Sequence, residues 1–290
     1  MNNNMVKRLK KIIKNNKITI MPCCYDVISA KLIEQAGFDL SFMSGFGVSA
    51  SKIGMPDTGL ISYGEMVDQG RQICTSVNIP IIGDGDTGYG NEMNVKRTVE
   101  GYYRAGFASI MIEDQLSPKQ CGHTKGKTVI TKNEACSRIK AAIDARNSDQ
   151  DILIMARTDA RYNHGIDEAI ERALLFEDLG ADIIFIEAPE TREEMIKICQ
   201  KITKPKVINL VEGGTTPMLT PSELESIGFN IIAYPLTLLS SSIKSMRNSL
   251  NSIKKGVHPY DDIMPFEELQ ETLGFNEYFR EEKLYNIKKK

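Results

Sequence analysis

The run Ser109-Ile110-Met111-Ile112-Glu113 decides how this chain can fold. It is short, almost continuously apolar, and ends on a carboxylate. Such a run indicates a parallel strand buried on both faces, because a half-exposed strand would alternate apolar and polar residues. Seven more runs of this kind are spread along the chain, at residues 18–21, 40–44, 79–83, 152–156, 183–187, 207–210 and 231–234.

The segments between these runs carry helix signals. Four of them begin with Ser or Thr followed three residues later by Glu, which is the pattern of a capping box. These pairs are Ser62/Glu65, Thr131/Glu134, Thr191/Glu194 and Thr220/Glu223. Glycine stands shortly before every second strand, where it can end a helix in the left-handed conformation. These glycines are Gly37, Gly106, Gly180 and Gly228.

Eight strand–helix units in about 250 residues predict an α/β fold, the (β/α)8 or TIM barrel. An open doubly wound sheet is the alternative, but it usually has fewer strands and a Gly-rich loop after the first strand. No such loop follows Met21. We expect the barrel and an N-terminal helix in residues 1–257. Residues 258–290 hold two amphipathic patterns, which are expected to pack on a neighbouring subunit rather than locally.

The overall composition is that of an ordinary globular protein. Of 290 residues, 41% are hydrophobic and 26% charged, and the net charge of −2 gives no reason to expect a nucleic-acid partner. The basic residues between Lys7 and Lys17 are interpreted as the solvated face of a helix. No apolar run approaches the ~20 residues that span a membrane. Six cysteines without a CxxC pair indicate neither a disulfide framework nor structural zinc, and a cytoplasmic location is expected.

Polar residues follow six of the predicted strands, at the barrel end that carries active sites. They are Ser44 to Gly47, Asp84 to Gly90, Glu113 to Gln115, Arg157 to Asp159, Glu187 to Pro189, and Asn209 with Glu212 to Gly214. One polar strand end would be unremarkable. Six on one rim are hard to explain structurally, because unpaired buried charge is costly. The set predicts a site for a metal ion and an anionic substrate.

Asp84, Asp86 and Glu113 offer hard oxygen ligands, with no histidine near them in the sequence. This favours Mg²⁺, or Mn²⁺ in its place, over Zn²⁺. The alternative is that the two aspartates only cap a turn. Arg157 is expected to clamp a substrate carboxylate, and a structural pairing with Glu187 or Asp159 is its alternative.

Residues 117–127 form a polar, basic segment that is longer than a strand–helix connection needs. Cys121 lies between Lys119 and His123, and two nearby cations would lower the thiol pKa and make it a usable acid or nucleophile. A lone cysteine is normally inert, which is the alternative. Cys23 and Cys24 are weaker candidates, and the other cysteines are expected on helices as packing residues.

The sequence Lys119-Gln120-Cys121-Gly122-His123, with Asp84-Gly85-Asp86-Thr87-Gly88 and Ile112-Glu113-Asp114, resembles the isocitrate lyase/phosphoenolpyruvate mutase superfamily. The resemblance covers roughly residues 18–285. Further matches are Tyr25-Asp26, Ser44-Gly45, Pro56-Asp57-Thr58-Gly59, Ala156-Arg157-Thr158-Asp159 and Glu187-Ala188-Pro189.

This resemblance implies a barrel whose eighth helix is swapped between subunits, usually in a dimer of dimers, that is, a homotetramer. It implies Mg²⁺ held by Asp84, Asp86 and Glu113, mostly through waters. The substrate-binding residues are expected to be Tyr25, Ser44, Gly45, Phe46, Gly122, Arg157, Glu187 and Asn209. The catalytic residues are expected to be Cys121, Asp57, Lys119 and His123.

Lyases of the superfamily carry a Cys-Gly-His loop, so Cys121 favours a carbon–carbon lyase acting on a small 2-hydroxy or 2-oxo carboxylic acid. Mg²⁺ would stabilise an enolate, and the thiol would protonate the departing carbanion. His123-Thr124, His164-Gly165 and residues 212–217 are similar to the branch that cleaves 2-alkylmalates, such as 2,3-dimethylmalate, and oxaloacetate. Gln120 replaces the usual Lys or Arg, which makes a tricarboxylate less expected.

Four other functions stay open. The first is a 2-methylisocitrate lyase. The second is a carbon–phosphorus enzyme, either a phosphonomutase or a phosphonopyruvate hydrolase, in which Lys119 and Lys125 would bind phosphoryl oxygens. The third is a barrel that has lost catalysis and acts as a binding or assembly protein. The fourth is an unrelated Mg²⁺-dependent barrel aldolase, against which residues 119–123 argue. Phe46, Ile208 and Leu236 are expected to form the apolar lining that selects the substrate side chain.

Overall fold

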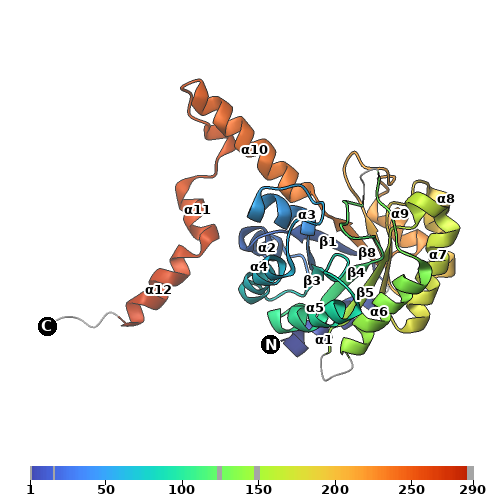
Figure 1. Cartoon of the computed structure of the whole chain (residues 1–290). Helices are drawn as coiled ribbons and strands as arrows, with labels where there is room; N and C mark the ends of the chain where they lie inside the picture. Colours follow the sequence, from blue (N-terminus) through green and yellow to red (C-terminus); the bar gives the residue numbers. More distant parts are fainter. Residues whose placement is uncertain (1, 16, 123–125, 147–150, 286–290) are drawn as a thin grey trace. The chain divides into compact units, whose positions relative to one another are not determined.

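A closed barrel of eight parallel strands forms the core of residues 1–239 (Figure 1). The computed structural model describes residues 2–15, 17–122, 126–146 and 151–285. The strands are β1 (Thr19–Cys24), β2 (Ser41–Met43), β3 (Ile81–Asp84), β4 (Ser109–Glu113), β5 (Leu153–Thr158), β6 (Ile183–Ile186), β7 (Lys206–Asn209) and β8 (Ile231–Tyr234). Each strand pairs with the next, and β8 pairs with β1 to close the barrel. The predicted (β/α)8 fold is confirmed.

Helices surround the barrel, as Figure 1 shows. They are α2 (Val27–Gln35), α3 (Gly45–Val48), the π-helical turn η1 (Ser49–Ile53), α4 (Tyr63–Ser76), α5 (Glu92–Ala105), α6 (Lys132–Arg146), α7 (Arg161–Leu179), α8 (Arg192–Lys201) and α9 (Pro221–Ile227). Before them comes α1 (Asn2–Ile13), and after them come α10 (Thr237–Lys254), the 3-10 turn η2 (Tyr260–Asp262), α11 (Phe266–Leu273) and α12 (Phe275–Tyr285).

Most of the predicted helix signals are confirmed. The predicted left-handed glycines have φ between 84° and 115°. Reciprocal capping bonds form at Ser62/Glu65, Thr131/Glu134 and Thr220/Glu223. The capping box predicted at Thr191 is half wrong. Thr191 accepts from the Glu194 N–H at 3.2 Å, but the Glu194 carboxylate bonds the Glu190 N–H and the Arg161 guanidinium, which is a stronger, charged partner.

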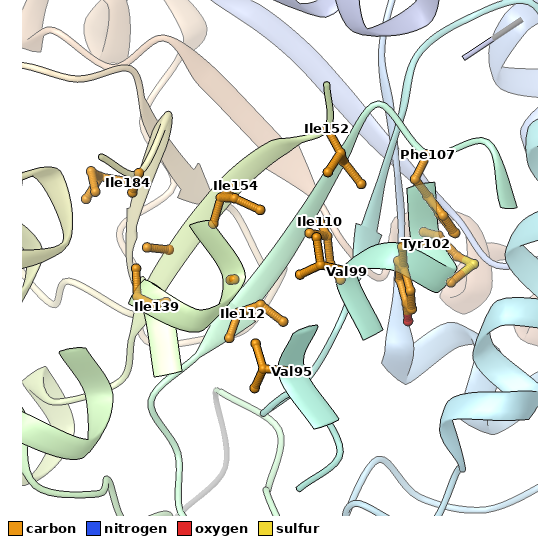
Figure 2. Close-up of a cluster of buried hydrophobic side chains, with 14 of the residues drawn as sticks. Val95, Val99, Tyr102, Phe107, Ile110, Ile112, Ile139, Ile152, Ile154 and Ile184 are labelled. Carbon is orange, nitrogen blue, oxygen red and sulfur yellow. The ribbon is translucent and has the colours of Figure 1, made fainter. Parts of the chain in front are cut away.

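Both faces of the strands are buried, in two separate layers of the core. On β4, Ile110 and Ile112 face outward into a cluster with Val95 and Val99 of α5 (Figure 2). Met111, between them, faces inward. The inner layer also contains Val6 and Leu9, both fully buried, so α1 covers the barrel end at which the strands begin. This double burial is why the strands read as continuous apolar runs.

The chain divides into two compact units, residues 1–239 and 240–290. The first contains the barrel. The second contains most of α10 together with α11 and α12. The helices α11 and α12 form where the two amphipathic patterns lie in the sequence. No residue of either helix is buried. The domain boundary expected at residue 257 stays a prediction, as does packing on a neighbouring subunit. None of the described helices is long and apolar enough to cross a bilayer.

The packing of α4 on the barrel predicts a stability effect at Gly70. A Cβ atom at Gly70 would lie 2.1 Å from Cζ of Phe107, whose ring stacks on Tyr102 at 4.7 Å. Alanine normally stabilises a helix interior relative to glycine by ~0.5–1 kcal/mol. We expect Gly70→Ala instead to lower the free energy of unfolding by ~1–3 kcal/mol, as overpacking does, measured by urea denaturation.

The matched control is Gly64→Ala in the same helix, where the nearest atom to a new Cβ is Ser62 Oγ at 3.9 Å. This variant is expected to be neutral or more stable by up to ~1 kcal/mol. Equal effects of the two substitutions would contradict the packing argument.

Candidate active site

Most of the predicted site residues line one cavity at the barrel end where the strands finish. Those lining it are Ser44, Phe46, Asp57, Asp84, Glu113, Lys119, Cys121, Gly122, Arg157, Glu187 and Asn209. Tyr25 packs against Gly47 instead, and is not among the described residues that line the cavity. Gly45 is also not among the described residues that line the cavity, but its backbone N–H donates to Asp84, which does line it. His123, and Lys125 with it, lie outside the described residues.

Three acids predicted to bind metal lie close together and are almost fully buried. Asp84 ends β3, and its two carboxylate oxygens accept N–H groups of Gly45 at 3.0 Å and Asp86 at 3.1 Å. Burial, and then the charge of Asp86, raise the pKa of Asp84 to about 6. Glu113 ends β4, and its Oε1 is buried without a hydrogen-bond partner among the described residues. Burial raises the pKa of Glu113 well above its ordinary value.

Lys119, two residues before Cys121, extends its side chain into this group of acids. Its Nζ lies 2.5 Å from Asp57 Oδ1 and 2.8 Å from Asp86 Oδ1, and the residue is 5% exposed. Burial disfavours the ammonium charge, but Asp86 and Asp57 outweigh it and raise the pKa of Lys119. Lys119 and Asp57, both predicted to be catalytic, therefore form a buried ion pair beside the predicted metal ligands.

The charge balance of the site fits a divalent cation. Apart from the buried Asp114–Arg172 pair, six carboxylates among the described residues face three cationic side chains, each at most 8% exposed. The acids are Asp57, Asp84, Asp86, Glu113, Asp159 and Glu187, and the cations are Lys119, Lys127 and Arg157. A buried excess of negative charge on hard oxygen donors suits Mg²⁺. Within the described parts of the chain, no three such side chains are close enough to hold an ion directly. Mg²⁺ in proteins usually keeps several waters, so direct ligation by three side chains is not required.

Arg157 makes the structural pairings and also faces the cavity. Its Nε and Nη2 donate to Asp159 at 2.8 and 3.1 Å, and Nη2 lies 2.9 Å from Glu187 Oε2. Its guanidinium lies over the Phe185 ring, 5.1 Å from the centroid. Asn209 Nδ2 donates to Glu187 at 3.1 Å, so this part of the rim is held rigidly by charge-assisted bonds.

Gly122, the residue after Cys121, lies directly against this arginine. A Cβ atom at Gly122 would be 2.3 Å from Arg157 Nη2 and 2.7 Å from Glu187 Oε2, so only glycine allows the backbone this close approach. Cys121 is half-buried and lines the cavity. Cys23 and Cys24, the weaker candidates, are buried outside it, and burial raises the pKa of Cys24 to about 12.

The apolar lining was only partly predicted. Phe46 and Leu236 line the cavity as expected, but Ile208 does not. Ile208 packs outside the barrel with Leu224, because side chains alternate along β7 and its neighbours Val207 and Asn209 face inward. Further apolar lining comes from Met21, Phe42, Met155, Phe185, Val211, Ala233 and Pro235, which the sequence analysis did not single out.

Lys127 is a polar residue near the site to which the sequence analysis gave no role. It is 2% exposed, and its Nζ donates to Asp159 at 2.7 Å and to the Gly122 carbonyl. The only available signal was its place in the basic segment 117–127, where a lysine is usually solvated.

Comparison with known proteins gives consistent matches along most of the chain. The family described as phosphoenolpyruvate phosphomutase matches residues 9–254. The chain is 42% identical to 2,3-dimethylmalate lyase of Eubacterium barkeri, covering 93% of this chain and 94% of the relative. It is 40% identical to the chloroplastic carboxyvinyl-carboxyphosphonate phosphorylmutase of Arabidopsis thaliana, covering 96% and 84%.

Two solved structures illustrate the range of similar proteins. Oxaloacetate acetylhydrolase in complex with the inhibitor 3,3-difluorooxalacetate superposes with a TM-score of 0.92, at 32% identity over 98% of each chain. Phosphonopyruvate hydrolase in complex with oxalate and Mg²⁺ superposes with a TM-score of 0.86, at 27% identity over 98% of this chain and 99% of the other.

The raised pKa of Asp84 predicts how pH affects the metal-free protein. A carboxyl group whose pKa rises from 3.8 to about 6 on folding stabilises the fold while protonated, and that contribution is lost as pH rises through this range. Asp84 should therefore lower the free energy of unfolding by roughly 1 kcal/mol between pH 5 and pH 7. Asp84→Asn should remove this pH dependence in urea denaturation with a chelator present.

Asp84→Asn also loses one of two accepted N–H bonds, so the change between the two pH values is the readout rather than absolute stability. Asp144→Asn, at an exposed surface pair with Lys140, is the control and should keep the wild-type pH dependence. An unchanged pH dependence in Asp84→Asn would show that Asp84 is ionised normally in the fold.

Proposed function

Because the chain belongs to the phosphoenolpyruvate phosphomutase family, we propose that it is a Mg²⁺-dependent carbon–carbon lyase of that family. Its substrate is a 2-alkylmalate-type 2-hydroxy acid, such as 2,3-dimethylmalate, cleaved to pyruvate and a short-chain carboxylate. Oxaloacetate, a 2-oxo acid that would be hydrolysed with one water molecule to oxalate and acetate, is the second candidate substrate. The identity to a 2,3-dimethylmalate lyase and the likeness to an oxaloacetate acetylhydrolase support this class.

The observation that carries the proposal is the position of Cys121. It lines the cavity that also contains Asp84, Glu113 and Arg157, and the adjacent Gly122 lies against the guanidinium. A thiol in that position can deliver a proton to a carbon atom of a substrate whose carboxylate is bound by Arg157.

The acids at the ends of β3 and β4 supply the metal part of the proposal. Asp84, Asp86 and Glu113 would hold Mg²⁺, or Mn²⁺ in its place, in part through waters. When bound, the ion would supply the positive charge that stabilises an enolate. Its positive charge would also balance the buried carboxylates, whose burial without compensation raises the pKa of Asp84 and Glu113.

Side chains of the protein bind the substrate and transfer the protons. Arg157 and Ser44 bind and orient the carboxylate next to the 2-hydroxyl group. Asp57, held by Lys119, accepts the proton of that hydroxyl as the bond between C2 and C3 breaks and C2 becomes a carbonyl carbon. The electron pair of the broken bond goes to C3, which takes a proton from Cys121 Sγ.

The cavity walls favour an alkyl substituent over a third carboxylate. Phe46, Val211 and Leu236 line it with apolar surface, and each buried methylene contributes about 0.8 kcal/mol. Gln120, which also lines the cavity, is neutral where a tricarboxylate would need a cation. This argues against a 2-methylisocitrate lyase.

The carbon–phosphorus alternative rests on the 40% identity to a phosphorylmutase and on the presence of Lys119. Against it, the Lys119 ammonium lies between Asp57 and Asp86, so a phosphoryl group would have to compete with two carboxylates. We therefore retain it as the second candidate.

A substrate panel with Mg²⁺, followed by proton NMR, tests the proposal. The panel contains 2,3-dimethylmalate, oxaloacetate, 2-methylisocitrate, isocitrate and phosphonopyruvate. We expect pyruvate and propionate from 2,3-dimethylmalate, and loss of turnover when Mg²⁺ is chelated. Cys121→Ser should lower kcat by at least ~100-fold, as removal of a general acid does. Cys136→Ser, in α6, is the matched control and should leave kcat unchanged.

The products distinguish the alternatives. Oxalate and acetate from oxaloacetate would identify the hydrolytic member of the class. Turnover of phosphonopyruvate alone would contradict the lyase proposal and leave Cys121 without the proposed role.

We also propose that the second unit of the chain packs on another copy in a homotetramer. Residues 263–285 expose a series of large apolar side chains, each 40–79% exposed: Ile263, Met264, Phe266, Leu269, Leu273, Phe275, Tyr278, Phe279, Leu284 and Tyr285. An exposed apolar surface of this extent is typical of protein interfaces. A second copy of the chain supplies an equivalent surface in a closed symmetric assembly.

The assembly proposal predicts a change in molar mass. Light scattering should give the mass of four 32.4 kDa chains for the wild type. The double variant Phe266→Glu/Phe279→Glu should be smaller, because burying two carboxylates at an interface is costly. Glu271→Gln, on the same helix as Phe266, should remain tetrameric. A wild-type protein that is monomeric at micromolar concentration would contradict the proposal.

A further inference from the structure

Lys127 is a lysine whose burial calls for an explanation. Lysine is almost never fully buried unless its charge is paired. Here the ammonium donates to Asp159 Oδ1 at 2.7 Å and to the backbone carbonyl of Gly122, and it lies 5.5 Å from the centre of the Tyr162 ring. The ammonium therefore bonds both Asp159, the residue after β5, and the backbone of Gly122, the residue after Cys121.

Asp159 connects Lys127 to the arginine of the site. Its Oδ1 accepts from both Lys127 Nζ and Arg157 Nη2, and its Oδ2 accepts from Arg157 Nε. Its backbone N–H donates to Asp114 at 2.9 Å, and Asp114 is itself paired with Arg172. Asp114 thus holds the backbone of Asp159, while Lys127 and Arg157 share its carboxylate.

The backbone on both sides of Cys121 is anchored. On one side, the N–H and C=O of Gln120 bond the side chain of Gln115 at 2.9 and 2.8 Å. On the other side, the carbonyl of Gly122 bonds Lys127. Gly122, the residue after Cys121, therefore bonds Lys127 and also lies close to the Arg157 guanidinium.

We propose that Lys127 is a positioning residue that ties the backbone at Gly122, next to Cys121, to Arg157 through Asp159, an inference that rests on the lyase function proposed above. It fixes the Gly122 carbonyl and so directs the Cys121 thiol at the substrate carbon. Without it, the carbonyl loses its partner and Asp159 is left to Arg157 alone. Proton transfer depends strongly on distance, and a displacement of about 1 Å can lower a rate 100-fold.

Three variants test the proposal. Lys127→Met keeps most of the length of the side chain and removes the ammonium. Lys127→Arg keeps a cation and hydrogen-bond donors. Lys132→Met is the matched control, because Lys132 pairs with Glu168 and Glu171 at the surface. For each protein, peptide mass spectrometry measures the rate at which iodoacetamide alkylates every cysteine without substrate, and steady-state kinetics gives kcat and KM.

We expect Lys127→Met to speed alkylation at Cys121 alone, with Cys136 and Cys199 unchanged as internal references. We expect kcat to fall roughly 100-fold with a smaller change in KM. Lys127→Arg should restore most of both properties, and Lys132→Met should match the wild type. Wild-type alkylation of Cys121 in Lys127→Met would overturn the proposal. So would faster alkylation of all cysteines together with a lower Tm, since that is loss of stability rather than of positioning.

The alkylation measurement needs no turnover, so it separates this inference from the proposed function. If no panel acid is turned over by the wild type, the lyase proposal fails, while selective exposure of Cys121 in Lys127→Met still supports the positioning role. Should Lys127→Met be insoluble, Lys127→Gln is measured in the same way, with the same expected and contrary outcomes.

Discussion

Burial of carboxylates at one end of the barrel is the constraint on which the rest of this structure depends. Among the described residues, and apart from the Asp114–Arg172 pair, six acids are buried there with three cationic side chains. Water cannot solvate them, so their charges must be paired, neutralised by protonation or balanced by a metal ion. The raised pKa values of Asp84 and Glu113 are the direct consequence in the protein alone. A divalent cation, as proposed above, is the complementary solution.

The fold meets this constraint by separating the two ends of the barrel. At the end where strands begin, Val6 and Leu9 of α1 complete an apolar layer that excludes water. At the other end, charged side chains come from consecutive strands and are held by bonds between neighbours, such as Arg157 with Asp159 and Glu187. The apolar layer stabilises the fold, so the charged side chains at the other end can be used for binding and catalysis.

Much of this could be predicted from local patterns. The eight strands were predictable because burial on both faces removes polar residues from them, and the site residues because polar side chains repeatedly follow those strands. The errors have local causes as well. Ile208 was assigned to the cavity because a continuous apolar run does not reveal which residues face inward. Glu194 was assigned to a cap because Arg161, its actual partner, lies 33 residues away.

The sequence by itself determined the fold class and the residue types at the strand ends, because periodicity and position along the chain are properties of short segments. Only the tertiary structure decided which charges meet. Arg157 pairs with both Asp159 and Glu187, and Lys127 shares Asp159 with it while holding Gly122. These pairings depend on how the closed barrel brings distant strands within hydrogen-bond range, and electrostatic pairing acts through space rather than along the sequence.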